Sequence, residues 1–279
     1  MKVIVSVTTT KARLGLFFYT FQSLKRQNYN NFRISINLSK EPYLFDDGID
    51  VVPDWMTGDN VQINSVNNSG PYRKLLPLIG KIGDDDILVT ADDDILYSEN
   101  WLKRLIDRAI ENPEVIVCCR ARVVKTNIFG RFQNYSNWEV CLKTEKSAYL
   151  LPTCGAGAVF RKDLLDLEFL NDEAYLKYAP TADDIWFRLA SIRKNTMVYV
   201  DPEIDEGNAY IRHNAGLEQV NLHRPKKRRR LHEQVIIKIL NKFNNYFGIP
   251  LSKNDFAWRK SVEYSNSSSE GSNSQRQAL

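Results

Sequence analysis

Stretches typical of buried strands alternate with stretches typical of helices along the first 120 residues, and this alternation is the strongest constraint on the fold. The strand-like stretches are rich in Val and Ile, whereas the helix-like ones repeat apolar residues every three or four positions. This order favours a parallel sheet flanked by helices. We expect strands at residues 2–9, 32–39, 61–66, 86–91 and 115–124, and helices at 16–26 and 101–112.

The second part of the chain is less regular. Residues 125–150 are aromatic without a clear period, and residues 41–59 form a long loop in the first part. We expect a short strand with glycines at 154–161, a helix at 180–195 with Thr181 as its N-cap, and a strand at 196–201. The fold class indicated is α/β.

Composition and charge limit the class of protein further. The chain has 279 residues, 43% of them hydrophobic, which is enough for one large α/β core. The net charge is +4, but the run at 226–230 alone contributes five positive charges, so the basic character is local. The four cysteines show no zinc-like spacing and are interpreted as packed free thiols.

Three consecutive aspartates, Asp92 to Asp94, end the apolar strand in the stretch ILVTADDDILYSENW. A solvated turn, with Ser98 to Asn100 capping a following helix, explains one or two of them. Adjacent carboxylates repel unless water or a cation screens them, and ligands of parallel sheets bind beyond the carboxyl ends of the strands. The pattern Asp-x-Asp favours Mg²⁺ or Mn²⁺ together with a diphosphate, as in a nucleotide-sugar donor.

The sequence resembles the glycosyltransferases of the GT-A fold, particularly bacterial family 2-like enzymes that build surface polysaccharides. The resemblance covers about the first 215 residues and rests on the ordered motifs VSVTTTKAR, SGPYRKLLP, TADDDILYSENWL and PTADDIW. It implies a GT-A catalytic domain at 1–215 with a Rossmann-like, mostly parallel central sheet. Its nucleotide-binding half would be 1–120 and its acceptor-binding half 121–215.

The resemblance also implies roles for polar residues on the donor side. Asp92 and Asp94 would hold Mn²⁺ or Mg²⁺. The nucleotide-sugar donor, with a UDP-sugar favoured, would lie against Thr8, Thr9, Lys74, Asp92 and Asp93. For the two threonines a plain strand-to-helix turn is an equally good interpretation. Arg73 and Lys74 would reach the donor phosphates as cations at a helix start, and the competing interpretation is a solvated helix face, which we favour for Arg73 but not for Lys74.

On the acceptor side, the resemblance implies that Asp183 or Asp184 is the general base that deprotonates the acceptor hydroxyl. Capping is the competing interpretation, because carboxylates are stabilised in the first turn of a helix. Spacing does not decide between the two, and we take Asp183 as the first candidate. Gly155 and Gly157 indicate either a close approach of the backbone to a ligand or a strand bulge.

The end of the chain combines a cationic run with a helix that has a broad apolar face. We expect a basic, amphipathic helical extension at 216–264 and a disordered tail at 265–279. Residues 226–247 would bind an anionic membrane surface, or the helix would pack on the catalytic domain or on a second subunit. No signal peptide or membrane span is recognised, so we expect a cytoplasmic protein, peripheral on the inner face of the cytoplasmic membrane.

The leading hypothesis is a metal-dependent, inverting glycosyltransferase that acts on a growing, lipid-linked surface glycan. A nucleotidyltransferase shares the metal and the nucleotide, but VTTTKARLG is a poor version of its glycine-rich loop. A different class is a non-catalytic nucleic-acid-binding protein that acts through residues 226–230. Because basic residues are not gathered elsewhere, nucleic acid is not the partner we expect.

Overall fold

The computed structural model describes residues 1–129 and 132–211. The expected helical extension at 216–264, the tail at 265–279 and the basic run at 226–230 all lie outside the described residues. Within the described ranges, no helix combines the length and the apolar character needed to cross a bilayer.

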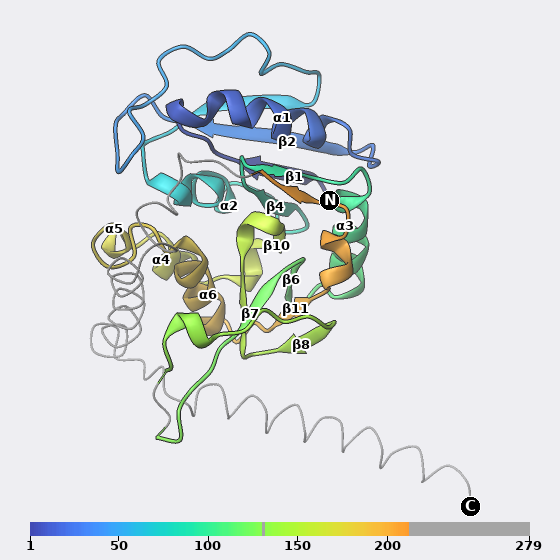
Figure 1. The fold of residues 1–279 in the computed structure, drawn as a ribbon, viewed down its shortest axis with the longest axis vertical. Coiled ribbons are helices and arrows are strands. Elements are labelled where there is room, and N and C mark those ends of the chain that lie inside the picture. The colour runs from blue at the N-terminus through green and yellow to red at the C-terminus, as the bar shows by residue number, and fades with distance from the viewer. Residues whose placement is uncertain (130–131, 212–279) are drawn as a thin grey trace, which may run out of the picture.

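An eight-stranded sheet forms the centre of the molecule (Figure 1). Its first half consists of parallel strands, in the order β3 (Val61–Ser65), β2 (Phe32–Leu38), β1 (Val3–Val7) and β4 (Ile87–Ala91). Its second half continues with β10 (Ala158–Phe160), β6 (Ile116–Cys118), β11 (Val198–Val200) and β8 (Glu145–Ser147). The expected α/β fold with a mainly parallel sheet is confirmed.

The second half of the sheet is mixed. β10 runs antiparallel to both of its neighbours, β4 and β6, whereas β11 runs parallel to β6. Two small sheets stand apart, β5 (Ile95–Leu96) with β12 (Ala209–Tyr210) and β7 (Ala121–Val123) with β9 (Leu150–Pro152).

The single strand expected at 115–124 is wrong, because these residues divide into β6 and β7 in different sheets. The pairing of β6 with β10 matches Cys118 with Ala158, the first residue of β10. After Cys118, one more bond on that side, from the Cys119 backbone N–H to the Gly157 carbonyl (3.0 Å), precedes the point where the chain turns away to pair with β9. The glycine stretch at 154–161 is likewise a strand only over 158–160, since a 3-10 turn precedes it.

Helices cover both faces of the sheet. On β1, Val3, Val5 and Val7 belong to one apolar cluster together with α1 (Leu14–Lys25) and α3 (Trp101–Glu111). Ile4, which points the opposite way, belongs to a second cluster with α2 (Leu76–Ile79), α4 (Leu167–Leu170), α5 (Ala174–Tyr178) and α6 (Asp183–Arg193). Burial on both faces explains why the strand is apolar without alternation.

The helix starts agree only partly with expectation. α3 begins at Trp101 with Asn100 at its N-cap, but no side chain of the expected group bonds there. α6 begins at Asp183 with Ala182 at its N-cap, so the prediction that Thr181 is the N-cap is wrong. Two acidic residues in the first turn replace the usual cap there.

A side chain from α1's end caps α3 from a distance. Gln27 Oε1 accepts from the Leu102 backbone N–H (2.8 Å), and its Nε2 donates to the carbonyls of Ser98 (2.9 Å) and Ser23 (3.1 Å). Gln27 thereby ties the segment that follows the three aspartates to α1. Because that segment leads directly out of the acidic turn, the cap also limits how far the turn can shift.

We predict that Gln27→Ala lowers the free energy of unfolding by about 1–2 kcal/mol, since it leaves buried groups at the start of α3 unpaired. Urea denaturation followed by tryptophan fluorescence measures the change. Gln22→Ala, which lies on α1 and outside this contact, is the control. An equal loss in both variants would show that the contacts of Gln27 with α3 do not cause the destabilisation.

Candidate active site

Two parallel strands end side by side at one edge of the sheet. Val7 at the end of β1 lies opposite Ala91 at the end of β4, so the residues that follow both strands meet. Thr9 Oγ1 donates to Asp93 Oδ2 (2.6 Å), whereas Thr8 Oγ1 donates to the carbonyl of Asn37 (2.8 Å). The two threonines thus serve different partners, one in the acidic turn and one in the neighbouring strand.

The three aspartates of this turn differ in exposure. The side chains of Asp92 and Asp94 are 38% and 28% exposed, whereas that of Asp93 is 8% exposed. Arg13 NH2 lies 2.5 Å from Asp93 Oδ1 and 2.9 Å from Asp94 Oδ2. Burial raises the pKa of Asp93 to about 6, although the charge of Arg13 and the Thr9 hydroxyl favour its ionised form. The middle aspartate anchors the turn, and the outer two face solvent.

Lys74 joins the acidic turn to α6. It ends the 3-10 turn Gly70–Lys74, is 6% exposed, and brings its Nζ to 2.6 Å from Asp92 Oδ1 and 3.2 Å from Asp183 Oδ2. Burial lowers the pKa of Lys74, but the two carboxylates outweigh burial and raise the pKa well above its ordinary value. Desolvation likewise favours protonation of Asp92, but Lys74 outweighs it and lowers the Asp92 pKa.

The acidic pair at the start of α6 is split between two partners. Asp183 forms the ion pair with Lys74, whereas Asp184 Oδ1 accepts from the backbone N–H of Cys154 (3.0 Å). Burial, followed by the negative charge of Asp183, raises the pKa of Asp184 to about 7. Burial also raises the pKa of Asp183, because it outweighs the attraction of Lys74. Two neighbouring carboxylates thus have different electrostatic surroundings.

The turn at residues 154–157 packs directly against the acidic turn. Tyr97 OH accepts from the Asp92 backbone N–H (2.9 Å) and donates to the Gly155 carbonyl (2.6 Å). A Cβ added to Gly155 would overlap the Asp92 carboxylate, and one added to Gly157, where φ is +121°, would meet the Trp101 ring. Both glycines thus allow close packing against side chains of the protein itself, and their approach to a ligand stays a prediction.

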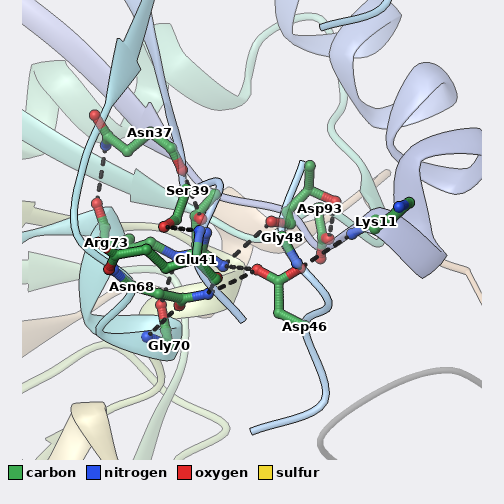
Figure 2. Close-up of polar contacts among 12 residues, drawn as sticks. Lys11, Asn37, Ser39, Glu41, Asp46, Gly48, Asn68, Gly70, Arg73 and Asp93 are labelled. Carbon is green, nitrogen blue, oxygen red and sulfur yellow. Dashed lines mark hydrogen bonds and ion pairs between the residues drawn. The ribbon is translucent and has the colours of Figure 1, made fainter. Parts of the chain in front are cut away.

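A buried ion pair between Arg73 and Asp46 lies next to the site (Figure 2). Arg73 is 1% exposed and its NH2 lies 2.8 Å from Asp46 Oδ2, so the interpretation of Arg73 as a solvated residue is wrong. Arg73 also donates to the carbonyls of Thr9 (3.3 Å) and Gly70 (3.1 Å). The other donors to Asp46 are the backbone N–H groups of Lys11 and Gly48 and the Asn68 amide.

The structure brings most of the candidate residues together. Lys74, Asp92 and Asp183 are in direct contact, and Thr9 contacts Asp93. Sequence analysis did not identify the roles of Arg13, Asp46 and Tyr97. The signal for Arg13 was present in the polar turn after the first strand, but its partner is identified only once the order of the strands is known.

The acidic edge has the donor chemistry of a site for a hard cation. In the part of the chain that the structure describes, no three His, Cys, Asp or Glu side chains are arranged to hold a metal ion by themselves. Asp92 and Asp94 nevertheless offer partly exposed carboxylate oxygens, and the edge gathers more carboxylates than cations. Two such oxygen ligands fit Mg²⁺ or Mn²⁺, which leave further coordination positions to other oxygen ligands.

Comparison with known proteins identifies the family. The family model described as glycosyl transferase family 2 matches residues 19–167, which is more than half of the chain. No curated protein sequence matches this chain. The crystal structure of S. aureus TarS 1–349 in complex with UDP-GlcNAc is 15% identical, has a TM-score of 0.50, and the match covers 88% of this chain and 67% of that one.

A second structure, S. aureus TarS 1–349, is 14% identical, with a TM-score of 0.46 and coverage of 88% and 72% of the two chains. At these identities the likeness concerns the fold, and the family model carries the assignment. The family and the GT-A fold expected from the ordered motifs are both confirmed. The chain therefore belongs to glycosyl transferase family 2 and is a glycosyltransferase.

Proposed function

We propose that this enzyme is a metal-dependent, inverting glycosyltransferase that moves a sugar from a UDP-sugar to a growing, lipid-linked bacterial surface glycan. The observation that carries the proposal is the meeting of two acidic segments at Lys74, whose Nζ lies 2.6 Å from Asp92 and 3.2 Å from Asp183. This meeting occurs at the carboxyl edge of the parallel strands, where ligands of such sheets bind. The complex of TarS with UDP-GlcNAc supports a UDP-sugar as the donor.

On the donor side, Asp92 and Asp94 are the residues that would hold Mn²⁺ or Mg²⁺. Such an ion, when bound, neutralises negative charge on the leaving diphosphate. Lys74 keeps the Asp92 carboxylate in a fixed orientation and adds a permanent positive charge beside it. That charge favours a diphosphate at this edge, so contact of Lys74 with the donor phosphates stays our prediction.

The nucleotide is expected against the ends of β1 and β4. Thr8, Thr9 and Asp93 are our candidates for this contact, as the family resemblance implied. In the protein itself, the Thr9 hydroxyl and the Asp93 carboxylate bond to each other (2.6 Å), which fixes the shape of the edge. Asp93 would therefore contribute to donor binding by holding the surrounding backbone and its partner Thr9 in place.

For the general base we favour Asp184 over Asp183, in contrast to our first choice from the sequence. Asp183 forms an ion pair with Lys74, whereas Asp184 is not ion-paired with any described residue. The backbone N–H of Cys154, which donates to Oδ1 (3.0 Å), and the Cys154 thiol orient the Asp184 carboxylate. A carboxylate with a pKa near 7 is also a better base at neutral pH than one with an ordinary pKa.

The proposed reaction is a single displacement. Asp184 takes the proton of the acceptor hydroxyl as that oxygen attacks the anomeric carbon of the donor sugar. The bond to the diphosphate breaks on the opposite side, and the diphosphate leaves with the electron pair. One attack from the face opposite to the leaving group inverts the configuration.

The donor side is tested by titrating the purified protein with uridine, guanosine and thymidine diphosphates, in Mn²⁺ and in chelator. We expect UDP to bind in Mn²⁺ and to bind about tenfold or more weakly in Asp94→Asn, because a charged ligand to the ion is lost. Isothermal titration calorimetry measures both affinities. Asp107→Asn, which removes an exposed carboxylate on α3, is the control.

Failure of all three nucleotides to bind the folded protein would contradict the donor assignment. Equal UDP binding in Mn²⁺ and in chelator would agree with a glycosyltransferase, but it would contradict the proposed metal dependence.

The base is tested through the pH dependence of turnover, with water as the acceptor and UDP release from a bound UDP-sugar as the signal. We expect Asp184→Asn to lose about 10²- to 10⁴-fold in rate while still binding UDP. In the wild type the rate should rise with pH through about 7, because the base acts only after it loses its proton. Asp183→Asn should keep this rise but move it to lower pH, since the charge of Asp183 raises the pKa of Asp184.

A pH profile that keeps its shape in Asp184→Asn but loses the rise in Asp183→Asn would assign the base to Asp183 instead.

A further inference from the structure

The two outer aspartates of the acidic turn each pair with a cation from a distant part of the chain. Asp92 pairs with Lys74, and Asp94 pairs with Arg13. Lys74 also contacts Asp183 and is almost completely buried, so it is part of the framework. Arg13 differs, because it reaches the partly exposed Asp94 from the turn that follows β1 and, among the described residues, forms no ion pair with α6.

Arg13 is anchored on one side only. One nitrogen, NH2, reaches both Asp93 Oδ1 (2.5 Å) and Asp94 Oδ2 (2.9 Å). Asp93 is itself fixed by the Thr9 hydroxyl and is only 8% exposed, whereas the Asp94 side chain is 28% exposed. Within the described ranges, the buried Nε of Arg13 has no hydrogen-bond partner. The contact with Asp93 is therefore the firm one, and Asp94 is the partner that Arg13 can release.

We propose that Arg13 is a built-in counter-ion that a divalent cation displaces from Asp94. This inference rests on the proposed metal ligands Asp92 and Asp94. A guanidinium and a divalent cation on the same carboxylate would lie a few ångströms apart and repel each other. Binding of the cation therefore favours loss of the Arg13–Asp94 pair, while Asp93 keeps Arg13 close enough to return.

Two consequences follow. In the absence of the metal, Arg13 neutralises part of the charge of three adjacent carboxylates, so the acidic turn keeps its shape without a ligand. In its presence, the affinity for the metal is weaker than the aspartates alone would give, because Arg13 must first be displaced. Arg13 is thus a positioning residue that sets the metal affinity.

The test is the affinity for Mn²⁺ alone, measured from the electron paramagnetic resonance signal of the free ion. We expect Arg13→Gln to bind Mn²⁺ on the order of tenfold more tightly than the wild type, because the competing charge is gone. Its unfolding temperature in chelator should fall, and Mn²⁺ should restore it. Lys11→Gln, which removes an exposed cation from the same 3-10 turn, is the matched control and should bind Mn²⁺ like the wild type.

Equal Mn²⁺ affinity in the wild type and in Arg13→Gln would overturn the proposal. Tighter binding in both Arg13→Gln and Lys11→Gln would overturn it as well, because the effect would then be one of general charge. Absence of Mn²⁺ binding in all three proteins would remove the metal from the proposed function, and this inference with it. UDP binding in chelator then distinguishes that outcome from loss of the donor site.

A measurement on the wild type keeps the proposal testable if Arg13→Gln does not fold. Phenylglyoxal modifies free guanidinium groups, and chymotryptic peptides report the labelling of Arg13 by mass spectrometry. We expect Mn²⁺ to increase labelling of Arg13 several-fold, while that of the exposed Arg26 stays constant. Unchanged or reduced labelling of Arg13 in Mn²⁺ would overturn the proposal.

Discussion

The Lys74 ammonium makes possible an arrangement that its neighbouring carboxylates would not adopt alone. Asp92 ends a strand and Asp183 starts a helix, and their oxygens lie 2.6 and 3.2 Å from the same nitrogen. Carboxylates brought together in surroundings of low polarity repel one another and tend to take up protons. Lys74 opposes both effects at Asp92, where it holds the pKa below its ordinary value. The acidic turn and the start of α6 stay together because this charge lies between them.

The position of Lys74 depends in turn on its neighbour in the sequence. Arg73 points into the buried ion pair with Asp46, and the carbonyl of Arg73 accepts from the Asn37 amide (2.9 Å). The backbone immediately before Lys74 is therefore fixed to β2 (Figure 2), and the Arg73 side chain bonds to the segment that follows β1. Two consecutive cations thus belong to two networks: Arg73 pairs with Asp46 beside the site, and Lys74 pairs with Asp92 and Asp183 within it. A buried ion pair is costly unless further hydrogen bonds satisfy it, and the donors around Asp46 supply them.

Patterns along the sequence predicted the parts of the site that are local. The apolar runs gave β1, β2, β3 and β4, and the abrupt change from Ala91 to Asp92 marked the edge at which we propose that the ligands bind. The roles of Arg13 and Asp46 could not be read in this way, because the ion pairs Arg13–Asp93 and Asp46–Arg73 join residues 80 and 27 positions apart and depend on which strands are neighbours. The break between β6 and β7 was missed for the same reason, since it is set by where β10 begins. Residues 183 and 184 look equivalent in the sequence, and only their different partners separate them.

The reversed strand β10 explains how one rigid framework can orient both sides of the reaction. It lies between β4 and β6, so the turn before it, residues 154–157, comes to lie beside the acidic turn. Tyr97 and the Gly155 carbonyl fix that turn to Asp92, while the Cys154 N–H fixes it to Asp184. The division into a donor half and an acceptor half at residue 120 stays a prediction, but strands from both ranges share a single sheet. The spacing between the proposed metal ligands, Asp92 and Asp94, and the proposed base, Asp184, is then determined by strand register and by one short turn. An insertion in that turn would change the reaction geometry even if every acidic residue were kept.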